Sequence, residues 1–423
     1  MRFLPHTKED RQEMLSAIGV SSIDELYKHV PEECRLKDLL KLPLHKSEIE
    51  VENILSQIAK KNISAIDRPF FLGAGSYYHH VPASVDHIIS RSEFLTSYTP
   101  YQPEVSQGTL TVIFEFQSMI STLTGMDIAN ASMYDGSTAM VEAALMAKRI
   151  TKRDNISLSG NIHPHYLETL ATYISNLGGE ISHNEPDENT ACVIVQRPDF
   201  LGEINSLDEI RKKCDQTGAM LIVVITEVIS LGLLPAPSEA DIVVGEGQSL
   251  GNKMQFGGPY VGFFACKKEF LRQMPGRICG QTVDANGKRA FVLTLSTREQ
   301  HIRREKATSN ICTSQGLCAT AFTIHLSLLG EEGFKKLALL NHYKAVKLAE
   351  KLSKIKGIKI ENKNFFNEFV ISLPDDSNKI AEKLNIAGIT PGLPLDNNRM
   401  LIAVTEMTSD QDIDSLCAAF ANI

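Results

Sequence analysis

The sequence predicts an α/β protein with a large domain built on a mostly parallel β-sheet and a small C-terminal α+β domain. Short, nearly continuous apolar runs alternate with helical segments in the middle of the chain, a pattern typical of parallel strands covered on both faces. The pattern then changes to long helices followed by a strand–helix–strand–helix unit. A chain of 423 residues is too long to fold around one hydrophobic core. We therefore expect three regions: a helical arm at 1–63, the large domain at 64–310 and the small domain at 311–423.

The N-terminal arm is expected to consist of short helices. Thr7 and Asp10 predict the start of a first helix, and Ser22 with Glu25, at capping-box spacing, predict the start of a second. Residues 46–61 carry apolar side chains at helical spacing and predict a third. Arms of this kind often wrap a partner subunit.

In the large domain, apolar runs and helical patterns alternate regularly. The apolar runs predict strands at 155–160, 191–196, 219–226 and 240–246. The helical patterns predict helices at 108–125, 137–151, 164–177 and 206–217. The strands are apolar along their whole length, so both faces of the sheet should be covered by helices.

The C-terminal region has a different order of elements. We expect helices at 313–329 and 332–355, and then a strand, a helix, a strand and a capped helix at 365–373, 377–388, 398–406 and 409–423. A large parallel-sheet domain followed by a small C-terminal domain is the outline of the aspartate-aminotransferase-like, fold type I enzymes that depend on pyridoxal phosphate (PLP).

Composition excludes several classes of function. A formal net charge of −8 argues against a nucleic-acid surface and gives no reason to expect membrane binding. The chain has no signal core at its start and no run of 18 apolar residues, and its eight cysteines are scattered, so we expect a cytoplasmic protein with reduced thiols. The histidines lack the spacing of metal ligands, and no metal site is expected.

One segment has the composition of a phosphate-binding site. In "YDGSTAMVEAAL", the residues Gly136, Ser137 and Thr138 fall at the predicted start of a helix, where free amides and the helix dipole attract an anion. The same residues also suit an ordinary helix cap, so both interpretations stay open.

A carboxylate follows a central strand of the predicted sheet. Glu227 comes directly after "LIVVIT", where PLP enzymes place a carboxylate that pairs with the pyridinium nitrogen. Its side chain is longer than the expected Asp, which favours a simple strand-end polar residue.

The turn after the strand at 240–246 lacks the expected lysine. PLP enzymes of this outline form their Schiff base with a lysine a few residues after this strand, but the chain has Gln248 and Ser249 there. Lys253 lies four residues further on, and nucleophile geometry tolerates little displacement. The sequence therefore predicts a cofactor scaffold without the covalent anchor, with Ser249 in the place of the lysine.

A stiff polar loop precedes the helix at 108–125. The stretch "YTPYQPEVSQGTL" combines two prolines with five side chains that donate or accept hydrogen bonds: Tyr98, Tyr101, Gln102, Glu104 and Gln107. It is either a rigid turn or the wall of a site, and functional residues are often carried on loops.

A basic run marks the predicted domain junction. "TREQHIRREKATSNICT" contains Arg303, Arg304, Lys306 and Asn310. It is either a solvated basic helix face or part of a pocket between the domains.

These motifs, together with "SEFLTSYTPYQPEVSQG", "NASMYDGST", "GGPYVGFFA" and "QMPGRICGQTVD", closely resemble the glycine decarboxylase (P protein) family of the glycine cleavage system. The resemblance extends from "LPHTKEDRQEML" almost to the C-terminus. The length and the missing lysine are similar to those of the α chain of the split form. In the lysine-bearing half of that family a His-Lys pair stands where this chain has Gln248-Ser249.

The resemblance implies an activity and partners. The activity is aminomethyl-transferring glycine dehydrogenase: glycine loses CO2 on PLP held by a β chain, and the aminomethyl group passes to the lipoyl arm of H protein. An α2β2 assembly, working with T and L proteins, is implied. The residues implied to face the β-chain cofactor are Tyr98, Tyr101, Gln102, Glu104 and Gln107. The channel or domain junction is assigned to Arg303, Arg304, Lys306 and Asn310.

The chain departs from the family pattern at two places. Glu227-Val228 stands where members often have Asp-Pro or Asn-Pro, and Asn252-Lys253 stands where a hydrophobic residue and proline are usual. These departures weaken only the expectation that the Gly136–Thr138 segment binds a cofactor-like anion.

Two alternative functions stay open at the level of sequence. A self-sufficient PLP aminotransferase or decarboxylase would use Lys253, and the purified chain would then be yellow. A regulatory subunit would change the kinetics of its partner without contributing residues to the site.

Overall fold

Two structural units, divided between Ile63 and Ser64, make up the computed structural model, which describes residues 6–38 and 40–422. The remaining residues of the predicted arm (1–5 and 39) and residue 423 of the predicted last helix lie outside the described residues. No described helix is both long and apolar enough to span a membrane.

The N-terminal unit contains two α-helices that the sequence predicts. Helix α1 (Lys8–Ile18) begins at the capping box of Thr7 and Asp10, and α2 (Glu48–Ala59) begins at a capping box formed by Ser47 and Glu50. None of the residues in these helices is buried.

The predicted helix beginning at Ser22 is wrong. The structure has only two 3₁₀ turns there, η1 (Asp24–Tyr27) and η2 (Glu32–Cys34). Pro31 confines a helix capped at Ser22 to residues 23–30, which is shorter than α1 or α2, and the shortest isolated helices are the least stable in water.

The second unit, which begins at Ser64 and which we call the body, contains a seven-stranded sheet with the order β1-β7-β6-β5-β4-β2-β3. Its strands are β1 (Ile128–Ala129), β2 (Asn155–Ser159), β3 (Ile181–Ser182), β4 (Thr190–Gln196), β5 (Met220–Ile225), β6 (Ile242–Glu246) and β7 (Gly262–Cys266). Neighbouring strands are parallel in the pairs β3–β2, β2–β4, β4–β5 and β5–β6, whereas β7 runs antiparallel to both β6 and β1. The mostly parallel sheet and its four predicted strands are confirmed.

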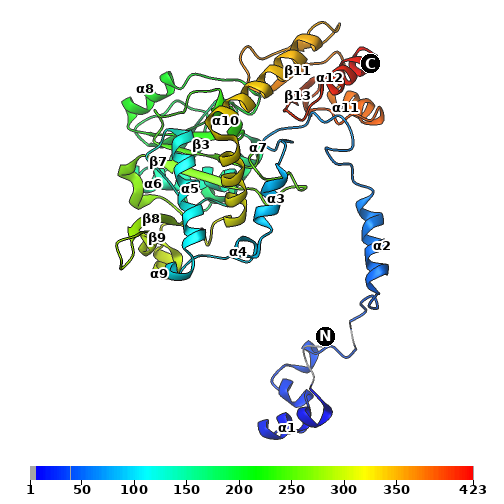
Figure 1. Ribbon diagram of the computed structural model, residues 1–423, viewed down its shortest axis with the longest axis vertical. Helices are drawn as coiled ribbons and strands as arrows, with labels where there is room; N and C mark the ends of the chain where they lie inside the picture. The colour runs from blue at the N-terminus through cyan, green and yellow to red at the C-terminus, as the bar shows by residue number, and fades with distance from the viewer. Residues whose placement is uncertain (1–5, 39, 423) are drawn as a thin grey trace. The chain divides into compact units, whose positions relative to one another are not determined.

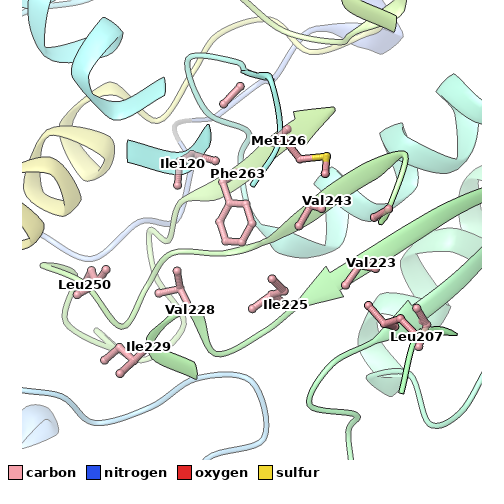
Figure 2. Packing of buried hydrophobic residues seen from close by; sticks show 14 of the residues in the cluster. Ile120, Met126, Leu207, Val223, Ile225, Val228, Ile229, Val243, Leu250 and Phe263 are labelled. Atoms are coloured by element: carbon pink, nitrogen blue, oxygen red, sulfur yellow. The ribbon is translucent and has the colours of Figure 1, made fainter. Parts of the chain in front are cut away.

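Helices cover both faces of this sheet (Figure 1). They are α5 (Gln107–Thr124), α6 (Gly136–Thr151), α7 (Pro164–Ile174), α8 (Asp208–Thr217) and α10 (Gly316–Leu352). Alternate strand residues face opposite sides: Val243 packs in the cluster with α5 and α10, while Ile242 and Val244 pack in the cluster with α6 and α7. Figure 2 shows part of the first cluster, in which Phe263 of β7 lies beside Val243.

The C-terminal region forms a four-stranded antiparallel sheet with the order β10-β11-β13-β12. Its elements are β10 (Lys359–Ile360), β11 (Glu368–Ser372), α11 (Ser377–Ile386), β12 (Leu393–Asp396), β13 (Arg399–Ala403) and α12 (Asp410–Ala421). Helix α10 is broken at Gly330, where φ is 59° and ψ is −176°, so it consists of two helices as the sequence predicts. The domain boundary at 310/311 stays a prediction.

The sequence prediction missed strands β1, β3, β10 and β12, and it also missed the hairpin formed by β8 (Ile278–Val283) and β9 (Arg289–Thr294). A signal for it was present, because Asn286-Gly287 lies in the turn and Gly287 has a φ of 78°. The short connecting helices are α3 (Ala83–Ile89), α4 (Ser92–Leu95), η3 (Pro103–Val105), η4 (Val228–Gly232), η5 (Lys268–Gln273), η6 (Ser296–Arg298), α9 (Gln300–Arg303) and η7 (Arg304–Lys306).

Candidate active-site surface and the cofactor position

The expected phosphate cup is the capped start of α6. Asp135 Oδ1 accepts a hydrogen bond from the backbone nitrogen of Thr138 and another from Ser137 Oγ, both at 2.8 Å. Gly136 donates its backbone N–H to Glu246 Oε2 at 3.0 Å. Side-chain carboxylates of the protein therefore occupy the position where a helix start would attract an anion.

Glu246 is the buried carboxylate at the end of β6. It also accepts hydrogen bonds from the backbone nitrogens of Gln248 and Val261, at 3.1 and 2.9 Å. Burial raises the pKa of Glu246 to about 7, although the hydrogen bonds from Gly136 and Val261 act in the opposite direction. The site is crowded as well: a Cβ atom added to Gly136 would lie 2.1 Å from the Tyr166 hydroxyl.

Residues 73–80 cross the adjacent part of the site. The Gln248 side chain accepts from the backbone nitrogen of Tyr77 at 3.0 Å and donates to its carbonyl at 3.1 Å. His163 Nε2 lies 2.9 Å from the carbonyl oxygen of Ala74, and the Tyr77 hydroxyl donates to Glu368 at 2.8 Å. The residue before the Schiff-base position thus binds the protein's own backbone.

His79 joins the end of β5 to the C-terminal region. Its Nε2 lies 2.9 Å from Glu227 Oε2 and its Nδ1 lies 2.8 Å from Glu406 Oε2. Burial alone would lower the pKa of His79, but the carboxylates of Glu406 and Glu227 outweigh burial and raise it to about 10. Burial likewise acts to raise the pKa of Glu406, and the charge of His79 outweighs it, so that this pKa falls to about 2. Glu227 is therefore committed to an internal ion pair.

A small cavity lies beside this network. The cavity beside Tyr77, Glu227 and Glu368 has a volume of about 10 Å³, which is the space of about one water molecule. Ser249 is buried, and Lys253 is exposed with its Nζ 2.7 Å from Asp86 Oδ2. This small cavity has no lysine among its lining residues.

The polar loop before α5 lies at the surface. Tyr98 and Tyr101 are 76% and 52% exposed, and Gln102 and Glu104 are exposed too. Gln107 behaves differently: its Nε2 donates to the carbonyls of Phe291 and Pro103 at 2.9 and 2.8 Å, and its Oε1 accepts from the Phe291 nitrogen. Gln107 therefore attaches the loop to β9, whereas the side chains of Tyr98, Gln102 and Glu104 are exposed.

The basic run is exposed and lies next to this loop. Arg303, Arg304 and Lys306 form no ion pair with any described residue, and Asn310 is exposed. Two contacts join the run to the loop: Thr99 Oγ1 lies 3.3 Å from Thr313 Oγ1, and the ring centres of Tyr101 and His301 are 5.4 Å apart. The two motifs thus form one exposed surface, which we call the loop–basic surface.

Sequence reasoning missed the residues that organise both places. They are His79 and Glu406, which contact each other inside the protein, Glu368, which contacts Tyr77, and Arg277, which supports the loop. The motif "QMPGRICGQTVD" indicated that Arg277 belongs to an unusual stretch, but not what it contacts. No local signal connects His79 with Glu406, which are 327 residues apart.

The fold defines a class of protein, the fold type I PLP-dependent enzymes, as the sequence predicts. A solved C-DES variant, with glycine covalently linked to the PLP cofactor, superposes with a TM-score of 0.61 over 86% of this chain and 100% of its own at 15% identity, which shows the fold alone.

A family model, glycine cleavage system P-protein, matches residues 1–420. The chain is 53% identical to a probable glycine dehydrogenase (decarboxylating) subunit 1 of Beijerinckia indica subsp. indica, with 100% of this chain and 99% of the relative covered. It is similar to the crystal structure of an inhibitor-bound glycine decarboxylase (P-protein) of the glycine cleavage system, with a TM-score of 0.92, 41% identity and complete coverage of both chains. The chain therefore belongs to the glycine cleavage system P-protein family, and the predicted family and glycine decarboxylase function are confirmed.

Proposed function

We propose that this chain is the α subunit of a two-chain glycine decarboxylase and that it contributes one wall of a site whose PLP is held by the β chain. The observation that carries the proposal is the filled cofactor position: Glu246 meets the start of α6, and residues 73–80 occupy the adjacent space. A chain of this family whose helix start is met by its own carboxylate, and which has Ser249 in place of the lysine, needs a second chain that holds the cofactor.

The loop–basic surface is the proposed contribution to that site. Tyr98, Tyr101, Gln102 and Glu104 present hydroxyl, amide and carboxylate groups that can bind and orient a reactant and exclude water. Gln107 keeps the loop in place from behind. Arg303, Arg304, Lys306 and Asn310 would line the approach or the domain junction.

The proposed assembly has further members. The β chain supplies the cofactor and its chemistry, and the lipoyl group of H protein accepts the aminomethyl group. We expect an α2β2 assembly in the cytoplasm, acting with T and L proteins. The exposed apolar face of α2 suits a role of the N-terminal arm in holding the β chain.

A regulatory subunit is the competing function, and loop variants separate the two. Glu104→Gln removes an exposed charge from the proposed wall, and Glu93→Gln on neighbouring α4 is its matched control. We expect Glu104→Gln to lower kcat/KM for glycine about tenfold or more in the assembled complex, because a reactant-facing group is lost. Full turnover of this variant would instead support a subunit that contributes no residue to the site.

A further inference from the structure

Arg277 is a buried arginine that neither the fold nor the cofactor position explains. It stands at the start of the β8–β9 hairpin in "QMPGRICG" and is 5% exposed. Its backbone is held rigidly, because Ala131 donates its N–H to the Arg277 carbonyl at 2.8 Å. Two residues further on, Gln117 accepts from the backbone nitrogen of Cys279 at 2.8 Å and donates to its carbonyl at 3.0 Å.

The guanidinium of Arg277 reaches the polar loop. Its Nη2 donates to the Tyr101 hydroxyl at 2.7 Å, and this is its one hydrogen bond to the described residues. Its Nε lies 3.2 Å from Glu299 Oε2, an ion pair that balances the buried charge. Nη1 of Arg277 and Oε1 of Glu299 are buried without a hydrogen-bond partner.

This arrangement costs free energy for folding, since burying an ion pair with unmatched polar atoms is often no better than apolar packing. The charge pair therefore contributes little net stability. Its main structural effect is to fix the half-exposed phenol of Tyr101, which also contacts the His301 ring of the neighbouring basic segment.

The chemistry of the contact gives it a direction. A guanidinium only donates hydrogen bonds, so the Tyr101 oxygen accepts from Arg277 and keeps its own O–H for another acceptor. Donation from a cation also polarises the phenol and strengthens its O–H as a donor.

We propose that Arg277 is a positioning residue for the decarboxylation: it fixes Tyr101 in the loop–basic surface, with its O–H available to an acceptor in the site shared with the partner chain. This inference rests on the proposed function above. It assigns a purpose to the "QMPGRICG" motif, namely to support the site wall from inside the body.

A first experiment tests the support of the loop in the isolated chain and needs no activity. The chain contains no tryptophan, so Val105→Trp, at an exposed position of the loop, introduces a single indole reporter. In this background we expect Arg277→Met and Tyr101→Phe each to increase acrylamide quenching of the indole, and Arg277→Lys to increase it less. Arg289→Met, which removes a guanidinium lying over Phe291 in the same hairpin, is the matched control. Unchanged quenching in Arg277→Met would overturn the proposal.

Loss of the fold is separated from loss of position by the charge partner. Arg277→Met leaves Glu299 buried without its cation, and this can destabilise the body. Arg277→Met with Glu299→Gln removes both charges. We expect this double variant to fold and still to show the increased quenching.

A second experiment measures the reaction in the complex with the β chain and H protein. Arg277→Met and Tyr101→Phe are each expected to lower kcat about tenfold with unchanged affinity between the chains. The variant that combines Arg277→Met with Tyr101→Phe should be no slower than either single variant. Additive losses, or full kcat in Arg277→Met, would overturn the proposal. An inactive wild-type mixture would instead contradict the proposed function, and the role of Arg277 in the reaction would fall with it. The quenching result would still test the Arg277–Tyr101 contact.

Discussion

The Glu246 carboxylate lies 3.0 Å from the backbone nitrogen of Gly136, so a side chain at the end of β6 meets the start of α6 from within the protein. In a helix start that binds phosphate, an external anion would take this hydrogen bond. Asp135 supplies a second internal carboxylate to the same turn. The two carboxylates make this end of the sheet a packed part of the body.

Replacing Glu246 by Gln should therefore destabilise the body. The amide has one oxygen for backbone donors that now use both carboxylate oxygens, so at least one buried N–H loses its acceptor. We expect the free energy of unfolding to fall by about 1–3 kcal/mol. Urea denaturation measures it, with Glu269→Gln at an exposed position as the control; equal stability of the two variants would contradict the assignment.

The His79 ion pairs predict how stability depends on pH. The pKa of His79 is raised from 6.5 to about 10, so its contribution is fully present below about pH 6.5 and is lost as the pH rises through 10. The pKa of Glu406 is lowered from 4.5 to about 2, so its contribution is present above about pH 4.5 and is lost as the pH falls through 2. The two overlap fully between these limits.

His79→Gln tests this dependence. Between about pH 6.5 and 9, the unfolding free energy of the wild type should fall by roughly 1–3 kcal/mol more than that of the variant, because only the wild type holds the extra proton. His87→Gln, at an exposed histidine of α3, should follow the wild type. Parallel pH profiles for wild type and His79→Gln would show that His79 carries no such proton.

Lys253 is expected to have no part in the reaction. It is exposed, and its amino group is paired with Asp86 at 2.7 Å. Lys253→Ala should leave glycine-dependent activity of the complex unchanged, and borohydride treatment of the isolated chain with PLP should give no specific label at this residue. Loss of activity together with specific labelling of Lys253 would support the alternative that this chain is a self-sufficient PLP enzyme.

The exposed face of α2 predicts a contact with the β chain. Val51, Ile54, Leu55 and Ile58 recur at helical spacing, and all are exposed. Leu55→Glu should weaken binding of the β chain about tenfold or more, whereas Gln57→Glu adds the same charge off this face and should not. Analytical ultracentrifugation or calorimetry distinguishes the two, and equal affinities would exclude this face from the interface.

Local pattern was sufficient for most of the fold. The apolar runs ending in Ile225 and Glu246 are strands of the sheet, and the capping boxes at Thr7 and Ser409 begin helices. The helix expected at Ser22 did not form because Pro31 leaves room for only a short helix there.

The site was less accessible to sequence reasoning because it depends on distant pairs. The missing lysine and the polar loop were visible as motifs; the structure buries Ser249 and exposes most of the loop, and their role in a shared site stays a prediction. The contact between Arg277 and Tyr101 joins residues 176 positions apart, and His79 meets Glu406 across 327. No periodicity or spacing encodes such pairs, since they arise only when the sheet and the two ends of the body are assembled.

The most direct test of the central claim is reconstitution. This chain, the lysine-bearing β chain and lipoylated H protein are mixed, and glycine-dependent CO2 release or bicarbonate exchange is followed, with each chain alone as control. The account predicts activity only in the mixture that contains both chains. Activity of this chain alone, or full activity of the β chain without it, would contradict the claim that the site is shared.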